Sequence, residues 1–269
     1  MANILQHTDG AIATITVSNP SKHNAITPEM WQALGEAFSA AERDPSVRVI
    51  ELTGEGEQAF VSGADIGRFG ERAATERVAT ERAATERAAT ISAPSNAPYL
   101  LPLACSKPTV ATIRGFCMGG GLGLAAACDI RLCADNAVFR MPAARLGIGY
   151  SFEGLGRVID LIGPANASDI FLSARRFNAA EALRLGFVQQ VLPLAEFAAA
   201  SRAYLTQMAE NAPLSLLAMK RSTRAWLQPA AERDMAAVKA AIAVCMQSDD
   251  HREGKAAFME KRTPNFQGR

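Results

Sequence analysis

GFCMGGGLGLAAACDI, residues 115–130, is the stretch that most restricts the fold of this 269-residue chain. Three successive glycines, Gly119 to Gly121, lead into an alanine-rich segment with the composition of a helix. Glycines at such a turn let the backbone approach a ligand closely, and the first turn of a helix leaves N–H groups without helical acceptors. The stretch therefore predicts a strand-to-helix turn that presents backbone donors to a negatively charged group.

Two common glycine-rich phosphate sites do not fit this stretch. A dinucleotide-binding fold needs an acidic residue about 20 positions further on, at the end of a strand, and neither Asp129 nor Asp135 is placed there. A nucleotide phosphate loop continues with G-K-[ST], which is missing here. A tight turn that binds no ligand stays open as an alternative at this point.

A second strand-to-helix turn lies upstream, in AFVSGADIGRF (59–69). A short apolar strand ends at Ser62-Gly63-Ala64, and Asp65 is placed to cap a following helix. Two such turns can direct two backbone N–H groups at one oxygen atom, which is the arrangement of an oxyanion hole. Each donor of this kind is worth roughly 3–4 kcal/mol of transition-state stabilisation.

Strands alternate with helices in the first two thirds of the chain, and helices dominate the last third. We expect strands near 11–17, 47–54, 59–62, 108–115, 129–133 and 137–140, and helices near 27–43, 164–173, 179–185, 194–210, 213–227, 230–248 and 251–261. This distribution predicts an α/β core, residues 1–200, followed by a helical C-terminal region, residues 201–269.

Residues 71–90 form an internal repeat, four copies of E-R-A/V-A-T. The composition favours a helix, but a five-residue step rotates successive glutamates by about 140° around the helix axis. Charge therefore winds around every face and leaves no apolar stripe for docking. We interpret the repeat as a solvated helical insert in the core, because the units of solenoid folds are about 20 residues or longer.

The composition limits the classes of partner. Apolar residues make up 49% of the chain and charged residues 20%, and the net charge is +1. These values are typical of a globular protein and provide no bulk attraction to nucleic acid or to an anionic membrane. No apolar run approaches the length of about 18 residues that a membrane span requires, and no secretory signal is visible. We expect a cytoplasmic protein without nucleic-acid or membrane partners.

Cysteine and histidine usage predicts neither disulfides nor a metal site. The five cysteines lack C-x-x-C spacing and mostly lie in apolar stretches, so buried reduced thiols are expected. The three histidines, His7, His23 and His251, form no cluster with metal-ligand spacing.

Taken together, these motifs resemble those of the crotonase superfamily, the enoyl-CoA hydratases and isomerases. The similarity runs along nearly the whole chain. It is carried by NPSKHNAI (19–26), FVSGADI (60–66), GFCMGGGLGLAAACDI (115–130), ARLGIGY (144–150), SARRFNAAEALRLGFVQQVLP (173–193) and FMEKRTPNF (258–266). The resemblance implies a spiral of ββα turns with a helical C-terminal region that mediates trimerisation, often as a dimer of trimers.

The resemblance also implies a substrate and a set of site residues. The substrate is an acyl-CoA thioester with no prosthetic group, and the backbone N–H groups of Ala64 and Gly120 form the oxyanion hole. Coenzyme A is expected along two backbone segments and at the C-terminus of a neighbouring subunit. The residues implied for this role are Lys22, Asn24, Ala25, Ser62, Gly63, Asp65, Ile66, Phe258 and Lys261. Simple surface solvation of Lys22 and Lys261 remains an alternative.

The chain departs from the family's hydratases at the two acid/base positions. Those enzymes use two glutamates as general acid and base, and the matching positions here are Gly123 and Ala143. The nearest candidates to replace them are Tyr150 and Glu153. Tyr150 acts either as a donor or as an aromatic wall. Glu153 acts either as a buried acid with a raised pKa or as a solvent-facing residue at a helix start.

Two classes of function stay open. The first is an acyl-CoA enzyme with altered acid/base groups, whose reaction is hydration, isomerisation, decarboxylation or thioester hydrolysis. The second is a CoA-thioester-binding protein with little catalysis, which the missing glutamates favour. Both classes use the same oxyanion hole.

Overall fold

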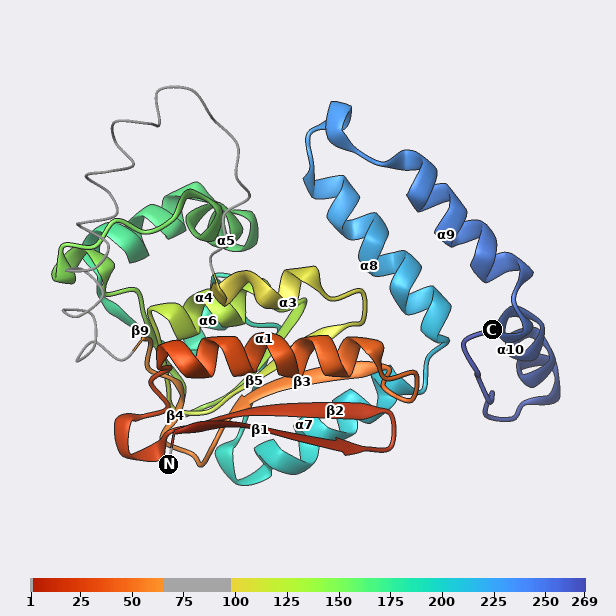
Figure 1. Cartoon of the computed structure of the whole chain (residues 1–269), viewed down its shortest axis with the longest axis horizontal. Helices are drawn as coiled ribbons and strands as arrows, with labels where there is room; N and C mark the ends of the chain where they lie inside the picture. The colour runs from red at the N-terminus through yellow and green to blue at the C-terminus, as the bar shows by residue number, and fades with distance from the viewer. Residues whose placement is uncertain (1, 65–97) are drawn as a thin grey trace.

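The computed structural model describes residues 2–64 and 98–269, which form two β-sheets and the helices around them (Figure 1). The larger sheet has six strands, in the spatial order β1 (Asn3–Asp9), β2 (Ile12–Ser18), β3 (Val49–Gly54), β5 (Thr109–Ile113), β7 (Ile130–Ala134) and β10 (Gln190–Leu192). The smaller sheet has four, in the order β4 (Ala59–Val61), β6 (Phe116–Met118), β8 (Val138–Arg140) and β9 (Arg176–Asn178). The predicted repeat at 71–90, and the predicted cap Asp65, lie outside the described residues.

The chain visits both sheets in each turn. The consecutive pairs β3–β4, β5–β6 and β7–β8 each place their first strand in the larger sheet and their second in the smaller one. Helix α4 (Gly120–Ala127) follows β6, and α5 (Phe152–Ser173) follows β8. Neighbouring turns pair in parallel in both sheets. The predicted α/β spiral of ββα turns is therefore confirmed.

The remaining helices lie around the sheets and at the C-terminus. They are α1 (Pro28–Arg43), α3 (Leu101–Ala104), α6 (Ala179–Arg184), α7 (Leu194–Ala209), α8 (Pro213–Leu227), α9 (Met235–Gln247) and α10 (Asp249–Glu260). Short 3-10 turns occupy Pro20–Lys22, Pro98–Leu100, Ala143–Leu146 and Ala230–Glu232. Helix α1 starts as predicted, because the Thr27 hydroxyl accepts a hydrogen bond from the Met30 N–H at 3.3 Å. None of the described helices is long and apolar enough to cross a bilayer.

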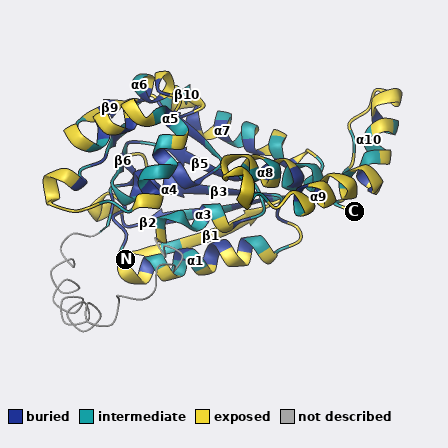
Figure 2. Ribbon diagram, turned by 90° about the horizontal axis from the view of Figure 1, so that it is seen from above, coloured by how far each residue is buried: buried dark blue, intermediate teal, exposed yellow. Residues whose placement is uncertain are grey.

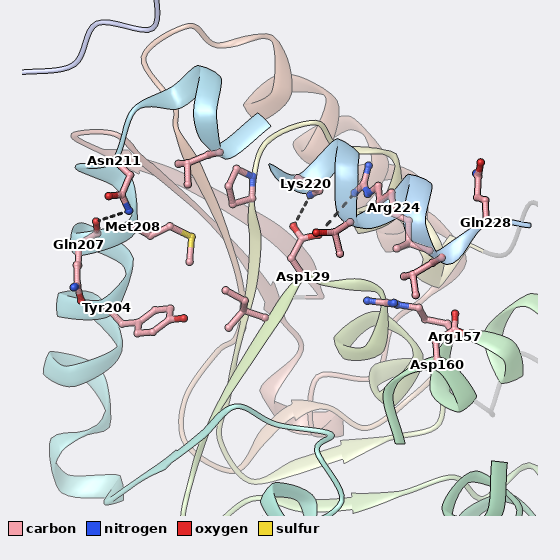
Figure 3. A pocket seen from close by; sticks show the side chains of 16 residues that line it. Asp129, Arg157, Asp160, Tyr204, Gln207, Met208, Asn211, Lys220, Arg224 and Gln228 are labelled. Carbon is pink, nitrogen blue, oxygen red and sulfur yellow. Dashed lines mark hydrogen bonds and ion pairs between the residues drawn. The ribbon is translucent and has the colours of Figure 1, made fainter. Parts of the chain in front are cut away.

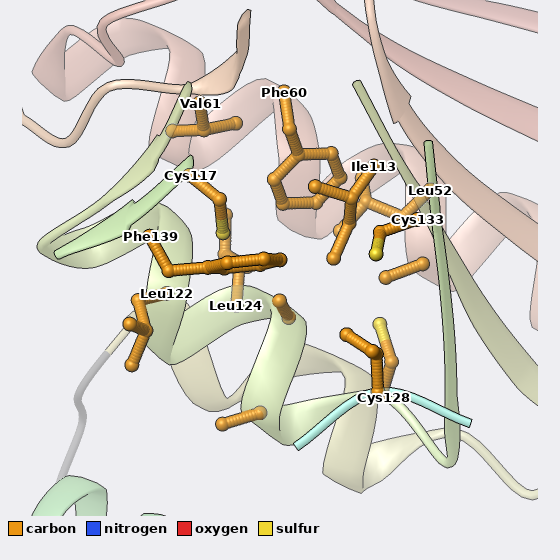
Figure 4. Close-up of a cluster of buried hydrophobic side chains, with 14 of the residues drawn as sticks. Leu52, Phe60, Val61, Ile113, Cys117, Leu122, Leu124, Cys128, Cys133 and Phe139 are labelled. Atoms are coloured by element: carbon orange, nitrogen blue, oxygen red, sulfur yellow. The ribbon is translucent and has the colours of Figure 1, made fainter. Parts of the chain in front are cut away.

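The hydrophobic core lies between the two sheets and around α4. Strand β5 is buried along its whole length, as expected for a parallel strand covered on both faces (Figure 2). Residues 121–127 of α4 are also all buried, and Figure 4 shows Leu122 and Leu124 beside Phe139 and Cys117. The glycine-rich segment is thus the central helix of the fold and not a surface loop.

Several elements differ from the sequence prediction. Strand β1 was not predicted because its residues are mostly exposed and show no apolar alternation. Strands β9 and β10 have three residues each, too few to show a period, so the segment after residue 155 is less helical than expected. Helix α5 begins at Phe152, earlier than expected, and is interrupted at Gly163, whose φ is 77°.

The predicted boundary between residues 200 and 201 falls inside α7. Phe197, Leu205 and Ala209 of this helix pack on the face of the larger sheet that includes Val49 and Val110. Helix α7 therefore belongs with the core by its contacts. We propose that the helical C-terminal region starts after α7, near residue 210.

A buried ion pair joins α8 to the core at the end of α4. Lys220 on α8 is buried, and its Nζ lies 2.5 Å from the Asp129 carboxylate and 2.5 Å from the Lys107 carbonyl oxygen (Figure 3). The Asp129 carboxylate also accepts hydrogen bonds from the Thr109 N–H and hydroxyl at 2.7 and 2.9 Å. The carboxylate of Asp129, the residue before β7, thus connects this strand to the start of β5 and to helix α8.

We expect Lys220→Ala to lower the free energy of unfolding by about 2–3 kcal/mol, because it leaves Asp129 without its ammonium partner. The loss is below that of a fully buried pair because 26% of the Asp129 side chain remains exposed. Urea unfolding measures it. The matched control is Lys239→Ala, an exposed lysine on α9, which should change stability by no more than about 0.5 kcal/mol. Equal losses in the two variants would contradict this role for Lys220.

Candidate active site

A buried asparagine holds the loop that precedes α1. The Asn24 side chain accepts a hydrogen bond from the Asn19 N–H at 2.9 Å and donates to the Ala59 carbonyl oxygen at 2.7 Å. Asn24 has a φ of 57°, in the left-handed region that asparagine tolerates better than most residues. Asn24 lies in a segment whose backbone is predicted to contact coenzyme A, and its side chain fixes that backbone against the start of β4.

The same loop pairs with the turn that follows β4. The Ser62 N–H donates to the His23 carbonyl oxygen at 3.1 Å, and the Ile26 N–H donates to the Gly63 carbonyl oxygen at 2.9 Å. The Ser62 hydroxyl donates to the Lys22 carbonyl oxygen at 3.1 Å. These bonds bring together the two backbone segments that the sequence predicts to contact coenzyme A.

The turn after β4 meets the turn after β6 at glycines. Gly63 has a φ of 113°, and a Cβ on it would lie 3.4 Å from the Met118 carbonyl oxygen and 3.8 Å from the Gly120 nitrogen. A Cβ on Gly120 would lie 3.9 Å from the Ala64 nitrogen and 3.6 Å from the Trp31 ring. The two backbones therefore approach each other closely, with Trp31 beside them.

The predicted donors Ala64 and Gly120 are available at this meeting point. Gly120 is the first residue of α4, so its N–H has no acceptor within the helix. Within residues 2–64 and 98–269, neither the Gly120 N–H nor the Ala64 N–H has a hydrogen-bond acceptor. The N-terminus of α4 adds a partial positive charge. This arrangement can bind and stabilise an oxyanion.

One helical turn further along α4, two tyrosine rings fill the space beside Gly123. The rings of Tyr99 and Tyr150 stack with their centroids 5.3 Å apart. A Cβ on Gly123 would lie within 3.0 Å of the Tyr150 hydroxyl and of the Tyr99 ring, and a Cβ on Gly154 would likewise overlap both rings. We call the space left by Gly123 and Gly154 the glycine hollow. It admits the tyrosine pair only because both positions lack a side chain.

The Tyr150 hydroxyl is buried in the glycine hollow and has no hydrogen-bond partner among the described residues. Burial, together with the neighbouring Tyr99, raises the pKa of the Tyr150 phenol well above its usual value. Phe171 also packs against Tyr150, with the ring centroids 5.2 Å apart and the rings inclined at 63°. Tyr150 is thus a neutral hydroxyl that can donate a hydrogen bond, and its aromatic wall and donor readings are both compatible with its position.

Neither position 143, where the family's hydratases have a glutamate, nor the candidate Glu153 supplies a carboxylate at this site. Ala143 is buried directly after Pro142, whose ring lies 3.7 Å from a Cβ placed on Gly119. Glu153 lies in the first turn of α5 with an exposed side chain, and Ser151 caps this helix by accepting from the Gly154 N–H at 3.1 Å. The position of Glu153 is that of a solvent-facing residue at a helix start.

Comparison with known proteins identifies the family. A family model described as enoyl-CoA hydratase/isomerase matches residues 7–269. The chain belongs to the enoyl-CoA hydratase/isomerase family. Carnitinyl-CoA dehydratase of Proteus mirabilis is 34% identical over 266 residues, covering 97% of each chain, and crotonyl-CoA hydratase of Syntrophomonas wolfei is 31% identical over 264 residues, covering 98% of this chain and 97% of the relative.

Solved structures agree with this assignment. The crystal structure of an enoyl-CoA hydratase/carnithine racemase from Magnetospirillum magneticum has a TM-score of 0.84 at 31% identity, covering 100% of this chain and 97% of that one. An enoyl-CoA hydratase/isomerase family protein from Hyphomonas neptunium has a TM-score of 0.86 at 29% identity, covering 99% and 98%. This family member is therefore an enzyme of the lyase or isomerase type.

The remaining residues predicted to contact coenzyme A lie in two separate parts of the structure. Lys22 is exposed and Ala25 is buried, both in the loop that Asn24 holds. Phe258 and Lys261 are exposed on α10 and just after it, and α10 lies at the opposite end of the chain from β4 and α4 (Figure 1). One chain does not bring them to the oxyanion donors. Asp65 and Ile66 lie outside the described residues.

Three residues at the site were not found from the sequence: Trp31, Tyr99 and Gly154. Tyr99 follows the charged repeat in a segment without a motif, and its place beside Tyr150 is set by packing between α4 and α5. The Gly-Tyr context around Tyr150 gave a partial signal. Within the described part of the chain, no group of three or more histidine, cysteine or acidic side chains is placed to hold a metal ion.

We expect Gly123→Ala to lower the free energy of unfolding by about 1–3 kcal/mol, because the added methyl group overlaps the tyrosine pair. Adding Tyr150→Phe should recover part of the loss by removing the nearest atom. The matched control is Gly156→Ala on α5, where a Cβ meets nothing within 4 Å. It should raise stability by up to about 1 kcal/mol. Full stability of Gly123→Ala, measured by urea unfolding, would show that the glycine hollow is not filled as described.

Proposed function

We propose that this chain binds an acyl-CoA thioester and stabilises the oxyanion formed from its carbonyl oxygen with the N–H groups of Ala64 and Gly120. The observation that carries the proposal is the approach of the two turns, in which a Cβ on Gly120 would lie 3.9 Å from the Ala64 nitrogen. Deprotonation, decarboxylation or attack next to a thioester places negative charge on that oxygen, and paired donors stabilise it. The named activities of the relatives, which act on crotonyl-CoA and carnitinyl-CoA, support a thioester substrate.

Coenzyme A, in this proposal, runs along the backbone at Lys22–Ala25 and at Ser62–Ile66. The Asn24 side chain acts indirectly, by holding the first segment against β4. Phe258 and Lys261 contact the nucleotide end of coenzyme A bound to a neighbouring subunit, since their own chain places them away from the donors. A lysine near phosphates is favourable electrostatically. No prosthetic group takes part.

Proton transfer differs from that of a two-glutamate hydratase. The described residues around the oxyanion donors supply a tyrosine hydroxyl, at Tyr150, and no carboxylate at positions 123 and 143. We assign Tyr150 the role of the polar group at the reacting carbon atoms. Glu153, which faces solvent, contributes to the start of α5. General acid or base groups contribute about 10²–10⁴-fold to rate, so hydration of crotonyl-CoA should be slow.

The lack of a carboxylate at positions 123 and 143 favours a second candidate reaction, the decarboxylation of a malonyl-type thioester. The bond between the α-carbon and the carboxylate breaks, CO₂ leaves, and the electron pair forms the thioester enolate at the Ala64 and Gly120 donors. The enolate carbon then takes a proton from water. This sequence needs no enzyme carboxylate as a base, because the substrate supplies the electron pair.

A panel of thioesters tests the proposal: crotonyl-CoA, 3-butenoyl-CoA, malonyl-CoA, methylmalonyl-CoA and acetyl-CoA, followed by chromatography and calorimetry. We expect binding of acyl-CoA, and hydration of crotonyl-CoA at least about 10²-fold slower than in two-glutamate hydratases. Gly120→Pro removes one donor at a helix position that tolerates proline, and it should lower kcat by about 10²–10³-fold. Fast crotonyl-CoA hydration would contradict the altered acid/base chemistry. Binding without any turnover would support the CoA-thioester-binding alternative.

We further propose a homotrimer, or a hexamer built from two trimers, in the cytoplasm, with a role in fatty acid metabolism. Helices α8–α10 project from the core and carry exposed apolar side chains (Figures 1 and 2). These include Met219, Trp226, Ile242, Met246, Phe258 and Met259. An exposed apolar surface of this kind favours association between subunits.

We expect light scattering to give three or six times the 28.6 kDa mass of one chain. Trp226 is 73% exposed on α8, so Trp226→Arg should lower that mass by placing a charge in the proposed interface. Leu5→Arg, at an exposed leucine on β1, is the control and should leave the mass unchanged. A monomer in the wild type would rule out the proposed assembly.

A further inference from the structure

A buried hydroxyl without a partner lies about one helical turn from the proposed oxyanion donors. Gly120 and Gly123 are three residues apart on α4, so their Cβ positions are about 5–6 Å apart on the same side of the helix. The first position lies 3.9 Å from the Ala64 nitrogen, and the second lies within 3.0 Å of the Tyr150 hydroxyl. An acyl chain that starts at a thioester carbonyl in the oxyanion hole is long enough to reach the Tyr150 hydroxyl.

The Tyr150 hydroxyl requires an acceptor. A buried polar group without a hydrogen bond costs free energy, and buried hydroxyl groups in proteins are normally paired. The described residues that surround this hydroxyl contribute aromatic rings, two glycines and, as the nearest polar side chain, Tyr99. None of them forms a hydrogen bond with it. Among residues 2–64 and 98–269 nothing pairs with this hydroxyl, so an oxygen atom of a ligand that approaches it can accept its hydrogen bond.

Tyr99 fixes the direction of this hydroxyl. Its ring stacks on Tyr150 at an interplanar angle of 20°, while Phe171 contacts Tyr150 at 63°. The Tyr99 hydroxyl is 2.6 Å from the Ser151 hydroxyl, and Ser151 also caps α5. Tyr99 is therefore anchored to the start of the helix that follows Tyr150.

We propose that Tyr150, positioned by Tyr99, forms a subsite for an oxygen acceptor on the β-carbon of the acyl chain. The inference rests on the proposed acyl-CoA function and names the class of acyl group: one that carries a hydroxyl, carbonyl or carboxylate oxygen at that carbon. An unsubstituted chain leaves the Tyr150 hydroxyl unpaired. Sites built to hydrogen-bond a substrate oxygen discriminate strongly against analogues that lack it.

Calorimetry with butyryl-CoA and with each enantiomer of 3-hydroxybutyryl-CoA tests the subsite, because these ligands differ only in the β-oxygen. We expect the wild type to bind one hydroxy enantiomer about tenfold or more tightly than butyryl-CoA. Tyr150→Phe should reduce that preference to about threefold or less while changing the Kd for butyryl-CoA little. Tyr204→Phe, at a tyrosine on α7, is the matched control and should keep the preference. Chromatography of the recovered ligand shows whether turnover has altered it.

The outcomes separate this inference from the function on which it rests. If no thioester binds to the wild type, the proposed acyl-CoA function is overturned, and the subsite with it. If the thioesters bind without preference, or the preference survives Tyr150→Phe, only the subsite is overturned.

The role of Tyr99 has a readout that needs no ligand, since the chain has three tyrosines. The phenolate absorbance of the wild type minus that of Tyr150→Phe reports Tyr150 alone, and it should show no ionisation up to about pH 11. The same difference in a Tyr99→Leu background should show one phenolate by about pH 11, because solvent then reaches the hydroxyl. Tyr99→Phe keeps the stacked ring and should behave as the wild type does. An unchanged titration and an unchanged ligand preference in Tyr99→Leu would overturn the positioning role.

Discussion

The close approach of two backbone turns is the constraint on which the rest of this structure depends. Gly63 and Gly119 both have positive φ, and Gly121 lies so close to Val61 that a Cβ would overlap its carbonyl oxygen. Each glycine therefore satisfies a separate requirement: two turn conformations, and one contact between α4 and β4. The parallel pairing of β4 with β6 brings the two turns to the same edge of the smaller sheet. A side chain at Gly121 would push α4 away from β4, and side chains at Gly63 and Gly119 would strain the two turns that present Ala64 and Gly120.

Hydrogen bonds from two arginine side chains hold the C-terminal end of α4 in place. Buried Arg131 donates to the carbonyl oxygens of Ala125 and Cys128 at 3.2 and 2.7 Å, and Arg157 donates to the Ala126 carbonyl oxygen at 2.8 Å. Two cations thus satisfy the C-terminal carbonyls of this eight-residue helix and complement its dipole. Because the helix cannot shift along its axis without breaking these bonds, the Gly120 N–H is held in place before any ligand arrives. Donors fixed in this way stabilise developing charge without reorganisation.

The sequence was sufficient for the parts of the site that are local in the chain. A glycine run before an alanine-rich helix, and a second glycine after a short strand, predicted two turns that present backbone N–H groups. The resemblance to the crotonase superfamily then assigned these donors to Ala64 and Gly120. The tyrosine pair was beyond this reasoning, because Tyr99 and Tyr150 are 51 positions apart and meet only through the packing of α5 on α4. The sequence likewise left two roles open for Glu153, a buried acid or a solvent-facing residue, because its exposure depends on how α5 packs. The structure shows it exposed at the start of α5. The strands β1, β9 and β10 were missed because exposure or shortness removes the apolar period on which strand prediction rests.

At position 123 a glycine replaces the glutamate of the family's hydratases, and a tyrosine pair fills the space that the glutamate side chain would occupy. The space next to α4 is not empty: the stacked rings of Tyr99 and Tyr150 occupy it, and Gly154 widens it from the other side. Packing is therefore kept while the polar group changes from an expected carboxylate to a phenol. A carboxylate at neutral pH accepts protons, whereas this phenol, with its pKa raised by burial, stays protonated and can donate a hydrogen bond. The oxyanion donors and the phenol together can stabilise an anion and bind an oxygen, but they supply no base. The chemistry best matched to such a site is one in which the substrate itself provides the electron pair.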